Sequence, residues 1–579
     1  MSAGQTRLLD RVHARLAARA RPATGFVSTP EPRTIGHFAR GRQLISGNFL
    51  FDGHLIEAPG RQIWDIGPPD APYAAGLQGC AWLDDLAAVG DGRARERAQA
   101  WVFGWIDRYG AGQGPGWTPD LAGRRLIRWI NHALFLLRGT DKATSDKFYA
   151  SLARQTIFLS RRWRSAAKGL PRFEALTGMI YAGLSLTGME RHVDPVVKAL
   201  AQDCKTQVDL TGGIATRNPE ELLEVFTLLG WAAQALAEAD KLVPAAHLAA
   251  IARIAPTLRA LRHADGGLAR FHGGSRGLDG RLDHALATSG VKGKVTQMLH
   301  MGFGRLAAGR TTVIIDASLP PKGAASAQGH ASTLAFELTS GRRPVIVNCG
   351  SGASFGADWR RAGRATASHS TLGIDGFSSS RLGQSGGSVD LLIETPTRVP
   401  CEISHYSRAQ QIEAQRIEAG HNGWQASHGL THARTLDLTP DGRSLAGEDL
   451  LTTLSDADKA RFDRAMDATA LQGIAYSIRF HLHPEIEASV DLGGAAISLA
   501  LKSGEIWIFR ADKTALMSLD RSAYLESGRL APRPSQQVVL SGRAMAYATR
   551  VRWTLAKAQD TPNALRDLAP DEADEQDKE

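Results

Sequence analysis

The spacing of hydrophobic residues changes near Gly309, and this change restricts the folds open to the chain. From about Cys80 to Arg262 the apolar residues recur every three or four positions, as in Leu121–Leu137. That spacing is typical of one face of an α-helix. After Gly309 the chain turns to short runs of β-branched residues, such as Thr311–Ala317 and Glu505–Arg510, separated by Gly, Asp and Ser. Such runs predict β-strands.

The two spacings predict two structural classes in series. Many helices joined by short loops form a bundle, a solenoid or a closed toroid, and the lack of a clear repeat of about 34 or 40 residues disfavours the common solenoids. Many short strands at close spacing are typical of an antiparallel β-sandwich. The predicted parts are a basic N-terminal segment of residues 1–23, a helical domain of residues 24–309, a β-sandwich domain of residues 310–558 and a disordered acidic tail of residues 559–579.

The N-terminus and the cysteines predict a cellular location. Met1–Ala23 is basic and lacks the apolar stretch of a secretory signal, so we expect a short amphipathic helix there. No apolar run approaches the ~18 residues of a membrane span. The four cysteines are scattered, without a CxxC pair, which disfavours a disulfide framework and a zinc ribbon. We expect a cytoplasmic protein; a periplasmic location would require an export route that the sequence does not reveal.

The net charge of +9 favours an anionic partner, either nucleic acid or an acidic polymer. Arginines are spread along the chain and no helix-turn-helix, RRM or zinc-finger pattern accompanies them, so we expect no nucleic acid. A merely solvated basic surface is the alternative. Tryptophans of the helical half sit mostly at core spacing, but Trp117, in the loop GQGPGWTPD, is a candidate platform for stacking on a sugar ring. The oligomeric state is open, a homodimer being one option.

The segment Gln328–Asp375 holds the richest set of polar residues. His330 opens one strand-like run, Asn348 closes the next, and His369 precedes a third. Side chains at the ends of neighbouring strands can converge, so these three residues are candidate ligands of a divalent metal, zinc above all. Asn is a weaker ligand than Asp. The alternative is that both histidines form hydrogen bonds inside the sandwich.

This segment resembles the C-terminal signature of the heparinase II/III-like family of polysaccharide lyases. The matching motifs are His330-Ala331-Ser332, Phe336-Glu337, Asn348-Cys349-Gly350, Trp359-Arg360, Arg364 and Ser368-His369-Ser370-Thr371. Further similar elements are Phe173–Gly183, Gly212-Gly213, Arg217-Asn218-Pro219, Gly429 and His432-Ala433-Arg434.

The resemblance implies an incomplete (α/α) toroid followed by an antiparallel β-sandwich, with the substrate cleft between them. It also implies β-elimination on an acidic, glycosaminoglycan-like polymer of uronic acids in a bacterial setting. That reaction needs a group that neutralises the C5 carboxylate, a base for the C5 proton and an acid for the leaving oxygen. Lyases of this family usually use Tyr, His and Asn for these roles.

The sequence departs from the family at several of these positions. Pro171-Arg172-Phe173-Glu174 stands where a helix usually begins with Asn-His. Glu221 stands in place of the Tyr, Gln328 in place of a His, and Asn348 in place of an Asp ligand. The resemblance therefore implies the family's fold for this chain, but it does not imply the family's usual catalytic base and acid.

The remaining polar residues form the predicted site. Arg217 and Arg172 are candidate carboxylate clamps, although either can instead sit in a structural ion pair. Glu174 and Glu221 open two helices and are candidates for the paired carboxylates of a glycoside hydrolase, or merely favourable charges at helix N-termini. The predicted catalytic residues are His330, His369, His272, Glu221 and Arg217, and the predicted substrate-binding residues are Arg172, Glu174, Trp117, Asn218 and Arg364.

Three functional hypotheses follow. The first is a polysaccharide lyase with a rewired site that acts on an acidic polysaccharide or oligosaccharide. The second is a glycoside hydrolase that uses Glu174 and Glu221. The third is a non-catalytic protein for glycan binding or envelope assembly. We expect the site residues to line one groove between the two domains, because helix starts, a Gly-rich loop and strand ends carry them.

Overall fold

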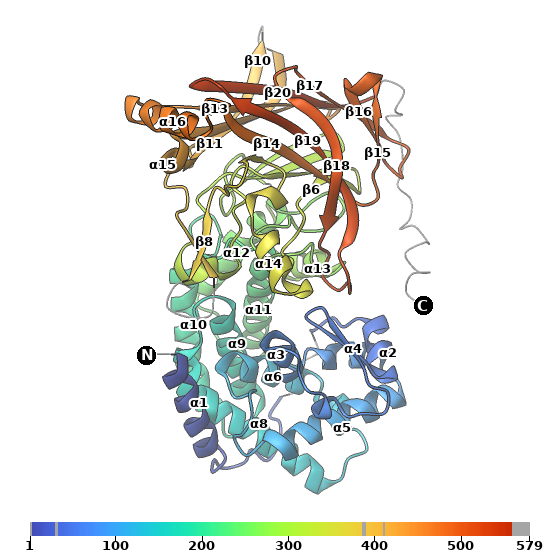
Figure 1. Cartoon of the computed structure of the whole chain (residues 1–579). Coiled ribbons are helices and arrows are strands. Elements are labelled where there is room, and N and C mark those ends of the chain that lie inside the picture. The colour runs from blue at the N-terminus through green and yellow to red at the C-terminus, as the bar shows by residue number, and fades with distance from the viewer. Residues whose placement is uncertain (1–2, 29–32, 294, 385–389, 409–410, 559–579) are drawn as a thin grey trace. The chain divides into compact units, whose positions relative to one another are not determined.

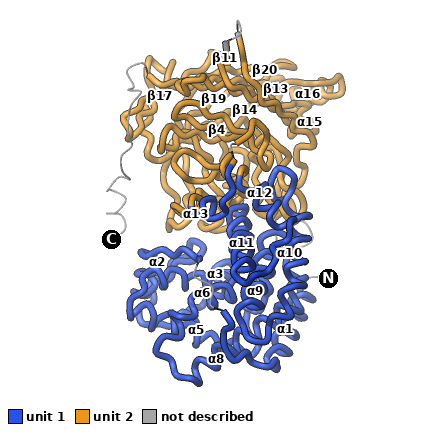
Figure 2. Tube along the Cα trace, turned by 180° about the vertical axis from the view of Figure 1, so that it is seen from behind, with its two compact units in different colours: residues 1–214, 221–255, 284–292 blue, residues 215–220, 256–283, 293–579 orange. Residues whose placement is uncertain are grey.

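The computed structural model describes residues 3–28, 33–293, 295–384, 390–408 and 411–558 (Figure 1). The predicted acidic tail, residues 559–579, lies outside the described residues. The chain divides into two compact units (Figure 2). Unit 1 comprises residues 1–214, 221–255 and 284–292, and unit 2 comprises residues 215–220, 256–283 and 293–579.

Unit 1 is helical, as the spacing predicts. Its helices, three of which extend into unit 2, are α1 (Ala3–Ala17), α2 (Phe38–Ser46), α3 (Ala71–Gln78), α4 (Trp82–Val89), α5 (Gly92–Tyr109), α6 (Pro119–Asn131), α7 (Ala133–Leu137), α8 (Lys142–Arg162), α9 (Leu170–Ser185), α10 (Val193–Gln207), α11 (Pro219–Glu238), α12 (Ala245–Ala260) and α13 (Arg281–Thr288). One hairpin, β1 (Asn48–Phe51) with β2 (His54–Glu57), interrupts the series. No helix of the described residues is long and apolar enough to cross a membrane.

Packing in unit 1 follows from aromatic and glycine positions. Trp101 and Trp105 of α5 are fully buried and meet the rings of Trp82 and Trp129 edge-on. Helix α6 crosses α9 closely because Gly123 faces Gly178, where a Cβ would lie 2.5 Å from the Gly123 Cα. The predicted N-terminal helix is present as α1, whose buried Asp10 pairs with Arg162 of α8 at 2.6 Å.

Unit 2 holds two antiparallel sheets. The first has the order β10-β11-β12-β13-β20-β17-β16-β15, and the second has the order β18-β19-β14-β6-β5-β4-β3, with β7 beside β14. The first sheet consists of β10 (Cys401–Arg408), β11 (Gln411–Trp424), β12 (Leu430–Leu438), β13 (Ser444–Thr452), β15 (Glu487–Asp491), β16 (Ala496–Ala500), β17 (Ile506–Ala511) and β20 (Ala548–Lys557). The second consists of β3 (Phe303–Ala308), β4 (Thr311–Asp316), β5 (Phe336–Ser340), β6 (Arg343–Val347), β7 (Leu372–Ile374), β14 (Ile474–Leu482), β18 (Leu516–Tyr524) and β19 (Arg533–Ala544).

The two sheets share one core, which makes unit 2 a sandwich. Phe336 and Phe480 of the second sheet pack on Trp553 of the first, with ring centroids 5.8 and 4.8 Å away. Outside the sheets lie a small hairpin, β8 (Arg381–Gln384) with β9 (Asp390–Ile393), and the helices α14 (Ala357–Gly363), α15 (Gln425–His428) and α16 (Asp456–Ala468).

The first strand of the sandwich starts before the predicted boundary at residue 309. Strand β3 begins at Phe303 and pairs along its whole length with β4. Its sequence, FGRLAA, is short and rich in small residues, so its alternation is weak. Residues 215–220 and 256–283, from the predicted helical domain, also belong to unit 2.

Candidate functional site

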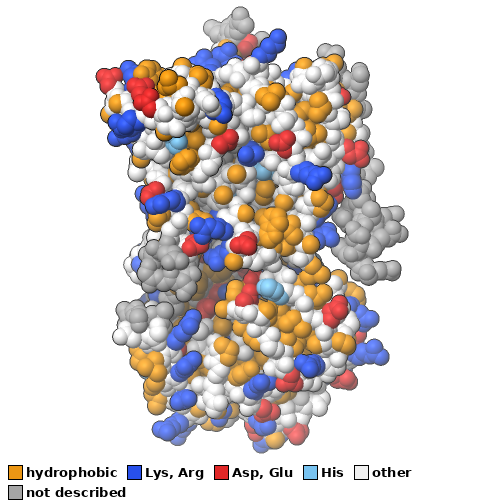
Figure 3. Space-filling model, in the orientation of Figure 1, with side chains coloured by type: hydrophobic (Ala, Val, Ile, Leu, Met, Phe, Trp, Pro, Cys, Tyr) orange, Lys and Arg blue, Asp and Glu red, His pale blue; other side chains and the backbone are white. Residues whose placement is uncertain are grey.

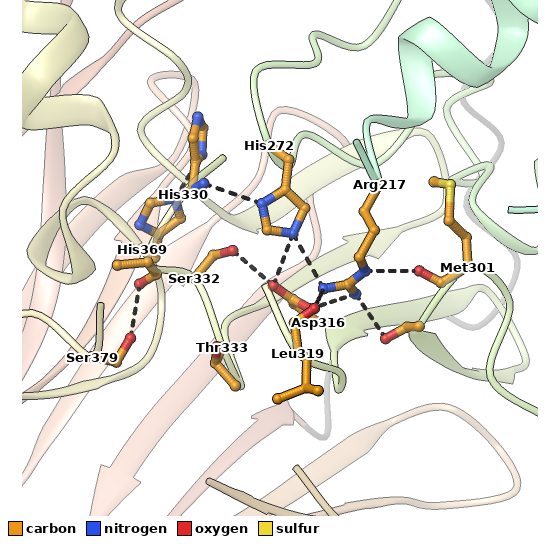
Figure 4. A network of polar contacts seen from close by, with 12 residues as sticks. Arg217, His272, Met301, Asp316, Leu319, His330, Ser332, Thr333, His369 and Ser379 are labelled. Carbon is orange, nitrogen blue, oxygen red and sulfur yellow. Dashed lines mark hydrogen bonds and ion pairs between the residues drawn. The ribbon is translucent and has the colours of Figure 1, made fainter. Parts of the chain in front are cut away.

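Asp316, the last residue of β4, is the centre of a buried polar network in unit 2 (Figure 4). Its Oδ1 accepts a hydrogen bond from Arg217 Nη2 at 2.6 Å, and its Oδ2 accepts one from Ser332 Oγ at 2.7 Å. Its Oδ2 also lies 3.3 Å from His272 Nε2. Burial by itself would raise the pKa of Asp316, but Arg217, His272 and Ser332 outweigh it and lower the pKa to about 2.

The hydrogen-bond donors of Arg217 have acceptors inside unit 2. Besides Asp316, it donates to the carbonyl oxygens of Met301, Gly302 and Leu319 at 2.9–3.0 Å. A guanidinium has five N–H donors, and these contacts occupy its three nitrogens. The geometry therefore contradicts the prediction that Arg217 clamps a substrate carboxylate; it neutralises a buried aspartate instead.

The three predicted histidines lie together, and their partners determine their tautomers. His272 Nδ1 accepts from the backbone N–H of His330 at 3.2 Å, so its Nε2 carries the proton toward Asp316. His330 Nε2 accepts from the Gly273 N–H at 3.1 Å, so its Nδ1 donates to His369 Nε2 at 3.0 Å. His369 Nδ1 donates to the Ala365 carbonyl at 2.8 Å. Every ring nitrogen thus has a partner, as a neutral imidazole with one donor and one acceptor allows.

These histidines are neutral at ordinary pH. All three are at most 1% exposed. Burial, and then the neighbouring His369, hold the pKa of His330 well below its usual value. Burial likewise lowers the pKa of His369 to about 4, and lowers the pKa of His272 despite the opposing effect of Asp316.

The donor atoms at His330, His369 and Asn348 do not fit a zinc ion. The two histidines are neighbours, as predicted, but the lone pairs that a metal would need already accept hydrogen bonds. Asn348 Oδ1 accepts from the Ser370 N–H, and its Nδ2 donates to Glu337. No group of three His, Cys, Asp or Glu in the described part of the chain is arranged to hold a metal. We assign no step to a metal.

The predicted site residues of unit 1 have structural partners. Arg172 Nη2 donates to the carbonyls of Arg164 and Ala166, and its guanidinium lies over the Trp163 ring. Glu174 is buried and pairs with Arg124 at 2.5 Å.

Glu174 is the fifth residue of α9, and Glu221, a residue of α11, reaches the N-terminal end of α9. Glu221 Oε1 is 3.5 Å from the N–H of Leu170, the first residue of α9, and Glu174 follows within that helix. Burial is the main reason that the pKa of Glu174 rises to about 7, against the opposing charge of Arg124. Its Oε2 has no hydrogen-bond partner among the described residues.

Three predicted substrate-binding residues have partners within the protein. Trp117 is 3% exposed, donates to the Tyr109 carbonyl and packs against Phe158, so the prediction of a sugar platform is wrong. The Gly- and Pro-rich loop around Trp117 predicts exposure, but the indole is large enough to reach from the loop into the core. Asn218 Oδ1 accepts from the Glu220 N–H at the start of α11. Arg364 is buried and donates to the carbonyls at positions 326, 329 and 390.

Two adjoining pockets of unit 2 form what we call the basic groove. Their volumes are about 820 and 540 Å³, and they share Phe377, Ala426, Ser427 and Arg461. The charged residues of the lining are Arg361, Arg364, Arg381, Arg461, Arg464, Arg543, Asp375 and Glu394. Asp390 and Asp458, outside the lining, pair with Arg361 and Arg461. The arginines remain in excess, beside a Phe377 ring that is 53% exposed.

Sequence reasoning missed the basic groove, apart from Arg364. Its residues come from α14, the β8 hairpin, α15, α16 and β19, which are far apart in the sequence. On the face drawn in Figure 3, basic side chains are likewise scattered among acidic ones. The weak signal was the arginine-rich run from Arg360 to Arg364.

Comparison with known proteins identifies a matching family domain and similar folds. Residues 291–554 match the family described as heparinase II/III-like, C-terminal. The chain carries a heparinase II/III-like C-terminal domain. Most of the chain resembles heparinase III in structure, with a TM-score of 0.69 at 13% identity, covering 94% of this chain and 88% of that one. A mutant of heparan sulfate lyase HepC from Pedobacter heparinus matches with a TM-score of 0.58 at 14% identity, covering 96% and 89%.

These likenesses show the fold: a helical toroid followed by an antiparallel β-sandwich. In sequence, the chain is 29% identical over 544 residues to FtsZ-localized protein C of Caulobacter vibrioides (strain NA1000 / CB15N), covering 91% of this chain and 89% of that protein. In this chain the histidines of the signature motifs have hydrogen-bond partners inside the sandwich at every ring nitrogen.

Proposed function

We propose that this heparinase II/III-like chain binds an acidic, uronic-acid-containing polysaccharide or oligosaccharide. The observation that carries the proposal is the basic groove, where arginines outnumber acids next to the exposed Phe377. Arginine recognises carboxylates in bidentate fashion, and an aromatic ring can pack against the face of a sugar. Two adjoining pockets offer room for more than one sugar unit, which suits a polymer.

The same proposal assigns no β-elimination to the buried histidines. That reaction needs a base with a free lone pair and an acid with a transferable proton. His272, His330 and His369 have both nitrogens engaged and lowered pKa values. Lyase activity with rewired residues is the first alternative. Hydrolysis is the second, because a Glu174 with a pKa of about 7 suits a general acid.

One experiment distinguishes binding without cleavage from lyase activity and from hydrolysis. The purified chain is incubated with heparan sulfate, hyaluronan and polygalacturonate, and binding, ultraviolet absorbance and new reducing ends are followed. Binding without either product supports the proposal. Rising absorbance from unsaturated uronates would mean a lyase, and reducing ends without absorbance would mean a hydrolase.

The basic groove is tested by a double variant, Arg381→Ala with Arg464→Ala. We expect binding to weaken roughly tenfold, the equivalent of one charged hydrogen bond. The matched control is Arg552→Ala, because Arg552 is ion-paired and exposed like Arg381 but lies outside the groove. Equal affinities in the double variant and the control would exclude the groove.

We also propose an association with the FtsZ-based division apparatus. The support is the alignment with FtsZ-localized protein C, which spans nearly the whole of both chains. Co-sedimentation of the purified chain with FtsZ polymers tests it, with unassembled FtsZ as the control. Recovery only in the supernatant would argue against direct binding. The cytoplasmic location and the homodimer remain predictions.

A further inference from the structure

A further pocket of unit 2, which we call the arginine pocket, has a volume of about 570 Å³. It lies among the segment 262–283, the turn between β5 and β6, the chain after β14, and the turn between β18 and β19. Tyr524 and Arg270 of its lining are 5% and 7% exposed. No residue of the Asp316 network or of the basic groove lines it.

Seven arginines and six carboxylates line this pocket, a net charge of +1. Glu526 is 3.3 Å from both Arg529 and Arg533. Glu485 is likewise shared, at 3.5 Å from Arg343 and 3.7 Å from Lys502. Arg276 is in turn shared between Asp265 and Asp279, and Arg262 pairs with Asp283, so the excess of arginines lies beside Glu526.

Arg270 adds a further charge, and Glu337 of the same pocket accepts a hydrogen bond from its backbone N–H at 3.0 Å. Its guanidinium donates to the carbonyl oxygens of Asn348, Cys349 and Leu525 at 3.0–3.2 Å. Carbonyls orient the group but carry no net charge. The guanidinium lies 4.1 Å from the centre of the Tyr524 ring, whose edge meets His483 at 5.1 Å.

The lowered pKa of His483 reflects the positive electrostatic potential of these side chains. Its pKa falls to about 3, first because it is buried and then because of Arg270, Arg533, Arg276 and Lys502. All four charges named here are positive, and each disfavours the imidazolium. A positive potential around buried polar groups favours the binding of an anion.

We infer that the arginine pocket binds a small sugar-like anion, a ring compound that carries a carboxylate or a phosphate. The volume falls within the ~300–1,000 Å³ of small-molecule sites. The arginines supply charged donors for the oxyanion, and the Tyr524 and His483 rings supply flat partners for the ring. This ligand differs from the polymer of the proposed function and uses different residues.

The test uses the full chain and isothermal titration with glucuronate, glucose 6-phosphate, inorganic phosphate and glucose. We expect at least one of the two sugar anions to bind, and glucose not to bind. Comparison of glucuronate with glucose 6-phosphate shows whether the pocket prefers a carboxylate or a phosphate. Tight binding of inorganic phosphate alone, binding of glucose as tightly as of the anions, or binding of none of them would overturn the inference.

The matched variants are Arg533→Ala and Arg552→Ala. Glu526 keeps Arg529 when Arg533 is removed, so the fold should survive, as circular dichroism can verify. Arg533→Ala should weaken the sugar anion about tenfold or more, Arg533→Lys less so, and Arg552→Ala not at all. Unchanged affinity in Arg533→Ala would contradict the site. The Arg381→Ala/Arg464→Ala variant should bind the small anion with unchanged affinity. The two proposals can therefore fail independently of one another.

Discussion

Arg217 and Asp316 form a buried ion pair on which the interior of unit 2 depends. Removing one partner leaves the other charge buried and unpaired, a change that typically costs about 3–5 kcal/mol. We therefore expect Arg217→Ala to lower the free energy of unfolding by a few kcal/mol, measured in urea. Arg217→Lys should restore little, because lysine cannot reach the carbonyls of Met301, Gly302 and Leu319 together. A variant as stable as the wild type would refute this structural role.

The buried histidines make stability fall with acid. The pKa of His369 is about 4 in the fold and 6.5 in its unperturbed state, so the unfolded chain binds its proton first. The stability that this group contributes is complete above pH 6.5 and is lost as the pH falls toward 4. Between pH 7 and 5 we expect a loss on the order of 2 kcal/mol from His369 alone. Urea unfolding at both pH values measures it, and a flat or opposite trend would contradict the neutral histidines. Asp316 extends the loss from pH 3.8 down to about 2.

At the scale of elements, the crossing of α6 and α9 depends on two glycines. A Cβ at Gly178 would lie 2.5 Å from the Gly123 Cα and 2.6 Å from its carbonyl oxygen. Backbone cannot yield as a side chain can, so Gly178→Ala should cost about 1–3 kcal/mol. Gly230→Ala in α11 is the control, because nothing lies within 4 Å of its Cβ position. The control should gain up to ~1 kcal/mol from helix propensity. Equal melting temperatures for the two variants would show that α6 and α9 do not cross so closely.

At the scale of the whole molecule, the chain passes between its two units several times. A cut at residues 309/310 separates β3 from β4 and leaves Asp316 without Arg217 and His272. We therefore expect the fragment 310–558 to fail to fold alone, whereas co-expression with the fragment 1–309 should recover soluble protein. Near-ultraviolet circular dichroism of each fragment tests this. A cooperatively folded 310–558 fragment would show that the contributions of residues 215–220 and 256–283 are dispensable.

The sequence by itself determined the features that depend on local pattern. Helical spacing in Leu121–Leu137 and alternation in Thr311–Ala317 predict α6 and β4, because the period of burial is a property of the segment. The motifs around His330, Asn348 and His369 predict the heparinase II/III-like domain and the closeness of the two histidines. His330 and His369 lie in the segments that precede β5 and β7, and Asn348 directly follows β6.

Only the tertiary structure decided what those residues do. An arginine has the same side chain in a substrate clamp and in a buried ion pair, and Arg217 became the latter because Asp316 and three carbonyls surround it. Trp117 is buried because Phe158 and Trp105 close over it. The basic groove and the arginine pocket collect charges from elements far apart in the sequence. Electrostatic potential depends on distance in space, and sequence separation carries no information about that distance until the fold brings the charges together.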